Sequence, residues 1–207
     1  MRNTHRICID KQTAISPGDC LVYSFGFYGD WTFEELMENY GCRVYVFDPK
    51  LTTLGDHQHS TNITFYLISL NNQNADGVVF DIAGTMRLRT LLTIYNKLVP
   101  EHGERIIDFL KIEPNFAGDD WDIIPELLKS EVIKKVRQME ILVRYGPTDP
   151  KKLQQNNTRN IKSLEDLGFV RFNSVPDPTG YFYNLYDYGE FTGFKLSWFN
   201  SNLTRVL

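Results

Sequence analysis

Two glycines and one acidic residue in the first quarter of the chain have the spacing of a ligand-binding site. Gly26 and Gly29 follow the apolar stretch 20–25 and precede a segment with helical spacing. Glycine accepts a positive φ angle and lets a ligand approach the backbone. Asp48 ends the next apolar stretch, where a carboxylate can accept hydrogen bonds from both hydroxyls of a ribose. The spacing is typical of a ribose-containing ligand, but it also suits a plain strand–turn–helix unit closed by an Asp-Pro turn.

The loop itself, Gly26-Phe27-Tyr28-Gly29-Asp30, differs from the G-x-G-x-x-G loop of dinucleotide-binding proteins. It lacks the glycine that lets a pyrophosphate approach, and Asp30 would repel an anion near the helix N-terminus. A ligand with a cationic end suits this loop better. S-adenosylmethionine has an ammonium, a sulfonium and a ribose but no phosphate, so the loop favours this cofactor over NAD.

Composition and charge narrow the class of protein. The 207 residues are 42% hydrophobic and 14% aromatic, which predicts one globular domain over 1–207, with a core at about 18–203 and an N-terminal extension, 1–17. A net charge of -4 argues against a nucleic-acid partner. No apolar run reaches the roughly 20 residues that a membrane-spanning helix needs, and the first ten residues contain no signal-like apolar region.

Apolar runs and helical spacing predict alternating strands and helices. Strands are expected at 20–25, 43–47, 63–70, 105–112, 136–145, 169–172 and 192–199. Helices are expected at 31–40, 85–98 and 120–130, and 161–167 is interpreted as the last part of a further helix. Thr32 and Glu35 suggest a capping box, Pro100 a helix end, and Pro125 a position near a helix start. This order predicts an α/β fold with a mostly parallel sheet and, since no helix separates the last two strands, an antiparallel hairpin at one edge.

The cysteines and glycosylation sequons give weaker indications of metal binding, disulfide bonding and cellular compartment. Cys8, Cys20 and Cys42 have no C-x-x-C spacing, so a zinc site built on cysteines is not expected. Cys20 and Cys42 lie in strand-like runs, which favours buried free thiols, with a Cys8–Cys20 disulfide as the alternative. The sequons at Asn62, Asn156 and Asn202 hint at the secretory pathway.

Several blocks of the sequence match the pattern of one known family. They are Ile7–Asp10, Cys20–Gly26, Gly29–Glu34, Gly41–Pro49, Ile107–Glu113, Asp120-Trp121, Gly168-Phe169 and Leu196–Asn200. On these residues the chain resembles the methyltransferase-like protein 24 family from about residue 7 to 203. The resemblance implies a Rossmann-like class I methyltransferase fold with a mostly parallel seven-stranded sheet and an antiparallel C-terminal hairpin strand. It also implies S-adenosylmethionine as cofactor, an unknown methyl acceptor, and a membrane-anchored or secretory location, although this chain shows no anchor.

The resemblance also assigns expected site residues. Gly26, Gly29 and Asp30 would line the methionine end of the cofactor, with Asp48 on the ribose. Lys111 and Glu113 would border the reaction centre, where Glu113 is the first candidate for a base and Asp119 the second. The contact of Glu34, at the start of the first helix, stays open.

Three departures from the family pattern fall on the cofactor side. Tyr28 replaces a glycine, and its phenol would obstruct the cofactor, point outward, or contact the sulfonium as a cation–π partner. Glu113 replaces an aspartate, and the second acid of that motif is missing. Asn71 or Asn72 replaces an acid near the adenine. These departures motivate an alternative, a methyltransferase fold that binds or supports other molecules without catalysis, and a weaker third candidate is a nicotinamide-dependent oxidoreductase.

Other polar clusters have plainer interpretations. Residues 119–122 (Asp-Asp-Trp-Asp) favour helix capping over a substrate site. His57 and His59 favour a solvated loop, and no metal site is predicted. Lys111 is expected to pair with Asp108 or Glu113, or else to face the cleft. The aromatic stretch 181–188 favours edge packing over a lid.

Overall fold

The computed structural model describes residues 4–27, 29–49, 55–79, 85–113, 119–145, 150–177 and 192–204. Its centre is an eight-stranded sheet with the order β10-β11-β9-β8-β1-β2-β4-β3. The strands are β1 Cys20–Phe25, β2 Cys42–Phe47, β3 His57–Gln58, β4 Ile63–Tyr66, β8 Ile107–Ile112, β9 Val136–Tyr145, β10 Phe169–Asp177 and β11 Thr192–Asn200. β4, β2, β1, β8 and β9 run parallel, whereas β11, β10 and β3 pair antiparallel. The predicted α/β fold and C-terminal hairpin are confirmed, and the two-residue β3 extends the expected sheet at its edge.

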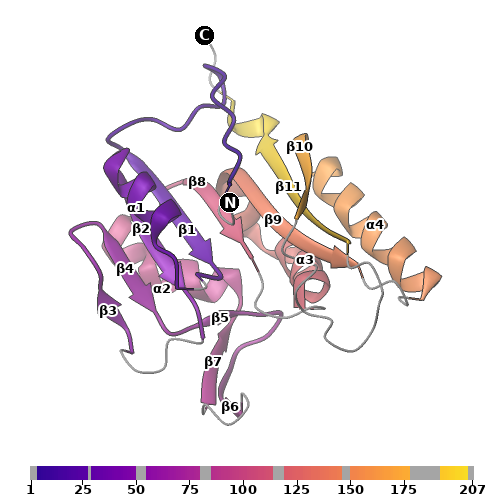
Figure 1. Cartoon of the computed structure of the whole chain (residues 1–207), viewed down its shortest axis with the longest axis horizontal. Helices are drawn as coiled ribbons and strands as arrows, with labels where there is room; N and C mark the ends of the chain where they lie inside the picture. Colours follow the sequence, from indigo (N-terminus) through magenta and orange to yellow (C-terminus); the bar gives the residue numbers. More distant parts are fainter. Residues whose placement is uncertain are drawn as a thin grey trace.

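A second, smaller sheet stands beyond the carboxyl ends of the central strands (Figure 1). It has the order β5-β7-β6, with β5 Ser69–Leu70, β6 Ala75–Val79 and β7 Thr85–Arg89. The helices are α1 Thr32–Asn39, α2 Leu91–His102, α3 Asp119–Lys129 and α4 Lys151–Asp166, with 3₁₀ turns at Glu131–Lys135 and Ser201–Leu203. Among the described residues, no helix has the length and apolar composition needed to cross a membrane.

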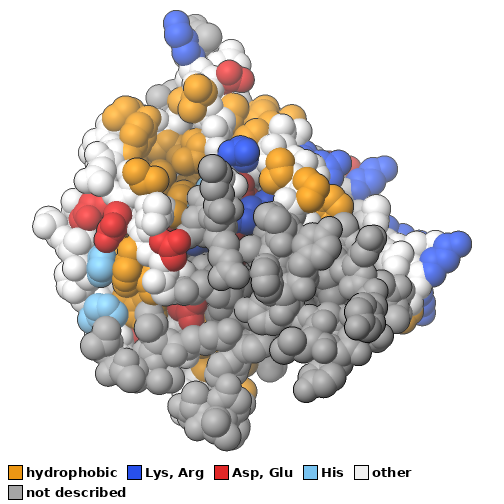
Figure 2. Space-filling view, in the orientation of Figure 1, with side chains coloured by type: hydrophobic (Ala, Val, Ile, Leu, Met, Phe, Trp, Pro, Cys, Tyr) orange, Lys and Arg blue, Asp and Glu red, His pale blue; other side chains and the backbone are white. Residues whose placement is uncertain are grey.

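The central strands are buried on both faces because both faces are covered. All six residues of β1 are buried, as expected for a strand in the middle of a parallel sheet. One core lies between the sheet and α2, α3 and α4. The other lies under α1 and the N-terminal segment, residues 4–17 (Figure 1). Figure 2 views this second face, where hydrophobic side chains gather over α1; Leu36 on that helix is 62% exposed.

Two predicted elements have other boundaries in the structure. The stretch 63–70 is not one strand: β4 ends at Tyr66, and the chain then enters the small sheet as β5. The stretch 85–98 is not one helix: its first five residues form β7, and α2 begins after Thr90, whose Oγ1 accepts a hydrogen bond from Thr93 N. Met86 and Leu88 fit both a strand and a helix pattern, and pairing with β5 and β6 decides for the strand.

Helix ends also differ from the prediction. Pro100 lies inside the last turn of α2, which runs to His102 and ends at Gly103 with φ +69°. Pro125 lies in the middle of α3. The capping box at Thr32 does not form: Asp30 Oδ1 accepts from Thr32 N, and Glu35 pairs with His59 instead. The last helix, α4, begins at Lys151, and its final part agrees with the helix end predicted at 161–167. Its start was not predicted, because the first half of the helix carries few apolar residues.

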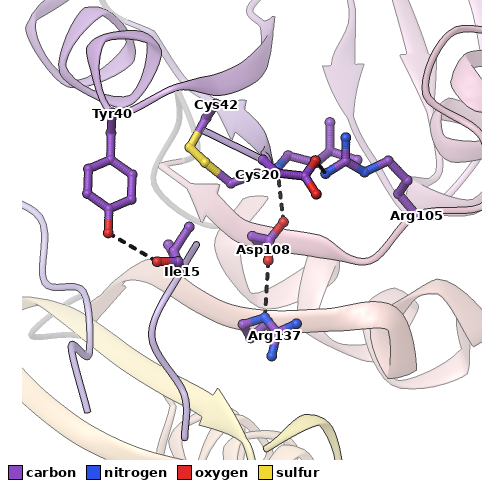
Figure 3. Close-up of a disulfide and its surroundings, with 9 residues drawn as sticks. Ile15, Cys20, Tyr40, Cys42, Arg105, Asp108 and Arg137 are labelled. Carbon is purple, nitrogen blue, oxygen red and sulfur yellow. Dashed lines mark hydrogen bonds and ion pairs between the residues drawn. A yellow bond between two sulfur atoms is a disulfide. The ribbon is translucent and has the colours of Figure 1, made fainter. Parts of the chain in front are cut away.

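A disulfide joins the first two strands at their amino ends (Figure 3). Cys20 and Cys42 are direct register partners across β1 and β2, with Cα atoms 4.4 Å apart. The prediction of free thiols and the alternative Cys8–Cys20 bridge are therefore wrong, although both bonded cysteines are buried. Spacing along the chain gave no sign of the pairing, which follows from the parallel register of the strands. Disulfides of this kind are typical of proteins that fold in oxidising compartments.

Around the disulfide, polar contacts hold the amino edge of the sheet (Figure 3). Asp108 Oδ2 accepts from Leu21 N at 3.0 Å, and its Oδ1 lies 3.1 Å from Arg137 Nε. Tyr40 donates its hydroxyl to Ile15 O at 3.1 Å, which attaches the N-terminal segment to the end of α1.

Replacing Cys20 and Cys42 together by serine should lower the free energy of unfolding by about 3 kcal/mol, because the bridge closes a loop of roughly 20 residues in the unfolded chain. Urea unfolding followed by circular dichroism measures this loss. Cys8→Ser, at a free thiol, is the control and should change stability little. An equal effect of the control and the double variant would contradict the assignment.

Stability should also depend on Glu126 of α3. Burial raises the pKa of this carboxyl from 4.5 to about 7. The folded state therefore holds the proton more tightly than the unfolded chain does. The stability that the protonated carboxyl provides is complete below about pH 4.5 and is lost as the pH rises through 7. Glu126→Gln should be more stable than the wild type at pH 8 by about 2 kcal/mol, allowing for partial solvent screening, with the difference vanishing near pH 4. Glu131→Gln, at a side chain that is 77% exposed, should show no such pH-dependent gain. Denaturant melts across this pH range provide the comparison.

Candidate functional site

A cavity of about 300 Å³ lies between the carboxyl ends of the central strands and the small sheet. Gly26, Pro49 and Glu113 come from the segments that follow β1, β2 and β8, and Asn71 follows β5. Most of the remaining wall is apolar: Phe25, Phe47, Ile68, Leu70, Val78, Met86, Leu88, Ile112 and Ile123, with Ser69. The volume is at the lower end of the range for small-molecule sites, and the position is where open α/β sheets bind ligands.

Gly26 lines this cavity at a point where the ends of neighbouring strands lie close together. Its φ angle is +83°, and its N–H donates to Phe47 O at 3.1 Å. On the other side, Glu113 N donates to Phe25 O at 2.9 Å, which draws the end of β8 against the end of β1. A Cβ atom on residue 26 would lie 1.7 Å from Glu113 O. The position therefore requires glycine both for its backbone angle and for the close approach.

Asp48 lies beside this loop, as its spacing predicted, but its carboxylate has a structural contact. The side chain is 1% exposed, and Oδ2 accepts a hydrogen bond from Phe27 N at 2.9 Å. This bond ties the β1–α1 loop to the end of β2. Gly29 and Asp30 lie further along the loop and are exposed, and the Asp30 carboxylate contacts the first turn of α1 through Thr32.

Lys111 points away from the cavity into a buried ion network. Its Nζ lies 3.0 Å from Glu34 Oε1 on α1, which also accepts from Ser24 Oγ at 2.6 Å. The expected pairing with Glu113 is present at 4.0 Å, whereas Asp108 pairs with Arg137. Burial alone would lower the pKa of Lys111, but Glu34 and Glu113 outweigh it and the pKa is raised, so this side chain remains an ammonium.

Glu113 lines the cavity next to Gly26. Its carboxylate enters the same ion network as Lys111. Oε1 lies 2.5 Å from Lys195 Nζ on β11. Burial alone would raise the pKa of Glu113, but Lys111 and Lys195 outweigh it, so the pKa is below its usual range. A carboxylate held in this way accepts a proton less readily than an unpaired one.

The network includes residues that sequence reasoning did not select. These further members of the network are Glu140 on β9, Lys195 and Ser197 on β11, and His5 of the N-terminal segment. The sequence contained one sign of this network, a charged residue with an apolar residue on each side in a predicted strand. This sign drew attention to Lys111, and it is also present at Glu140 and Lys195. Tyr28 and the aromatic stretch 181–188 lie outside the described residues, as does the side chain of Asp119.

A family model described as a methyltransferase domain matches residues 3–189. The chain belongs to this methyltransferase-domain family. Among curated relatives, a human protein named "Probable methyltransferase-like protein 24" is 26% identical in an alignment 189 residues long, which covers 79% of this chain and 50% of that protein. The rat protein of the same name is 27% identical over 138 residues, 64% of this chain and 36% of its own length. The resemblance drawn from the sequence blocks is confirmed, and the chain spans half or less of these relatives.

Solved structures of methyltransferases are also similar to this domain. A geranyl diphosphate methyltransferase is 13% identical, with a TM-score of 0.46 over 93% of this chain and 82% of the other. The N-methyltransferase NodS from Bradyrhizobium japonicum is 10% identical, with a TM-score of 0.44 over 87% of this chain and 85% of the other.

Gly26→Ala should disrupt the carboxyl edge of the sheet, because the added methyl group would collide with the backbone of Glu113. We expect a loss of about 3 kcal/mol or more in the free energy of unfolding, measured by denaturant melts. Gly29→Ala is the matched control: its φ is +80°, but no other part of the described chain lies within 4 Å of the added Cβ, so only backbone strain of about 1 kcal/mol applies. Equal losses in the two variants would show that the contact with Glu113 does not matter.

Proposed function

We propose that this methyltransferase domain binds S-adenosylmethionine in the cavity beside Gly26 and catalyses transfer of its methyl group to an acceptor. The single observation that carries the proposal is the 300 Å³ cavity at the carboxyl ends of β1, β2 and β8, in a chain of this family. When bound, the cofactor supplies an electrophilic methyl group on a sulfonium. The residues of the chain have to bind it, orient the acceptor and accept any proton that the acceptor loses.

The lining of the cavity fits the parts of this cofactor. The apolar wall formed by the small sheet, including Leu70, Met86 and Leu88, suits the faces of an adenine ring. Asn71 offers an amide that can both donate to and accept from the adenine edge. We assign the ribose to Asp48 and the methionine end to the loop of Gly26, Tyr28, Gly29 and Asp30, on the expectation from family resemblance.

Glu113, Lys111 and Asp119 are the proposed residues of the reaction centre. Glu113 borders the cavity, but Lys195 holds its carboxylate, so we propose that it orients neighbouring groups and acts as a base only if that ion pair opens. Lys111 would support it through the shared network. Asp119, at the start of α3, is the second candidate for the base.

A second function is favoured by the hydrogen bond at Asp48 and the ion pair at Glu113. In the described part of the site, the carboxylates of Asp48 and Glu113 both have partners inside the protein. Such a site could bind a cofactor or another small molecule without accepting a proton. The alternative function is therefore that of a binding protein without catalytic activity. Assays of cofactor binding and of methyl transfer together distinguish it from a methyltransferase.

Calorimetric titration with S-adenosylhomocysteine should show binding in the micromolar range. Asn71→Ala should weaken it about tenfold, the equivalent of one lost hydrogen bond, and Asp48→Ala more, because that change also frees the loop at Phe27. Asp19→Ala, at an acid with an 81% exposed side chain on the amino edge of the sheet, is the control and should bind like the wild type.

The outcomes separate the possibilities. Unchanged affinity in both Asn71→Ala and Asp48→Ala would remove the cavity assignment. Binding of S-adenosylhomocysteine without transfer of a labelled methyl group to any acceptor in an extract would favour the alternative. A thermal shift with NAD but not with S-adenosylhomocysteine would favour an oxidoreductase.

A further inference from the structure

The face of the sheet under the N-terminal segment carries a belt of buried polar side chains. They project from four adjacent strands: Ser24 on β1, Lys111 on β8, Gln138 and Glu140 on β9, and Lys195 and Ser197 on β11. The N-terminal segment crosses this part of the sheet in front of β8 and β9 (Figure 1). Gln138 holds the segment through its side chain, which donates to Cys8 O and Thr13 O at 2.9 Å and accepts from Cys8 N.

His5 inserts into this belt. Its side chain is 3% exposed and its Nδ1 lies 2.7 Å from Glu140 Oε1. Glu140 itself is fixed, because its Oε2 accepts from Ser197 Oγ at 2.9 Å and from Arg6 N at 3.0 Å. The imidazole also packs against the ring of Phe33, with centroids 4.4 Å apart. Among the described residues, the buried Nε2 atom of His5 has no hydrogen-bond partner.

His5, Glu113 and Glu140 converge on one point. One ligand atom from each residue can be chosen so that all three lie within 4.8 Å of one another. Nitrogen and oxygen ligands at about 2.0–2.2 Å from a zinc ion are themselves roughly 3–4 Å apart, so the three ligand atoms would have to move closer together to hold such an ion. Glu113 can keep Lys195 while it binds a cation, because a carboxylate accepts at about four positions.

The charges of the belt also call for a cation. Glu34, Glu113 and Glu140 contribute three buried carboxylates, against two ammonium groups from Lys111 and Lys195. Apart from His5, the group has one more buried carboxylate than ammonium groups, an imbalance that is unfavourable away from water. A metal cation held by these carboxylates would bring positive charge to the group.

We propose that His5, Glu113 and Glu140 form a binding site for a divalent cation of the zinc type, which fastens the N-terminal segment to the sheet. One imidazole and two carboxylates are a ligand set that zinc accepts, and Ser197 and Arg6 N support the Glu140 carboxylate from behind. The sequence predicted no metal, because these ligands are scattered along the chain and meet only through β8, β9 and the N-terminal segment. The site does not depend on methyl transfer.

The test uses the full chain after treatment with a chelator. Titration with Zn²⁺ should show one strong site, and Co²⁺ should give a visible absorption band of a low-coordinate nitrogen and oxygen site. His5→Asn and Glu140→Gln should each weaken Zn²⁺ binding by about 100-fold and abolish the cobalt band. The double variant His57→Asn/His59→Asn removes two histidines in and beside β3 and is the matched control; it should bind like the wild type.

Other results would overturn the proposal. Zn²⁺ binding that survives His5→Asn, or that is lost in the His57/His59 control, would place the ion elsewhere. No binding of Zn²⁺ or Co²⁺ to the wild-type chain would show that the three side chains meet without holding an ion. Circular dichroism of each variant verifies that the sheet is folded, and His5→Gln provides a second variant if His5→Asn is not.

Discussion

The central position of β1 between β2 and β8 is the constraint on which the candidate site depends. Because β1 pairs in parallel with both neighbours, the segments after all three strands reach the same edge of the sheet. Backbone hydrogen bonds from Gly26 N to Phe47 O and from Glu113 N to Phe25 O hold these ends together. The resulting distance between Gly26 and Glu113 leaves no room for a side chain at residue 26. The wall of the cavity is therefore a consequence of strand pairing rather than of any single polar contact.

The second constraint is the cost of burying charge. Lys111 and Glu34 are almost fully buried, and neither would be stable there as a lone ion. Each needs the other, and the network extends through Glu113 to Lys195 on β11 and toward Glu140 on β9. A network of this kind defines the position of α1 on the sheet, since removing one partner leaves an uncompensated charge. It also links the end of β8, at the cavity, to the face covered by the N-terminal segment.

These contacts change how the acidic residues of the site are interpreted. Asp48 follows β2 and Glu113 follows β8 at the carboxyl edge of the sheet, and the contacts of both side chains described here are with the protein. Asp48 positions the loop that carries Gly26, and Glu113 joins the ion network. The two carboxylates are therefore engaged inside the protein, while Gly26 and Glu113 line the cavity at the ends of β1 and β8.

Local sequence patterns determined much of the fold. The apolar stretches at 20–25 and 136–145, the glycine after the first strand and the pair of adjacent C-terminal strands predicted a mostly parallel sheet with a hairpin, as observed. The same patterns failed at 63–70 and 85–98, where short apolar runs fit more than one element and pairing within the small sheet decides between them. The Cys20–Cys42 bridge was missed for a related reason, since only strand register brings those residues together.

The sequence by itself determined the class of fold and the family, and it drew attention to Gly26 after the first strand, which lines the cavity, because these depend on residue type and short-range spacing. Only the tertiary structure decided which charges meet. Lys111 contacts Glu34 across 77 positions, and His5 contacts Glu140 across 135. Pairings over such distances depend on which strands lie next to each other and on which segment covers them, and no local pattern encodes that choice.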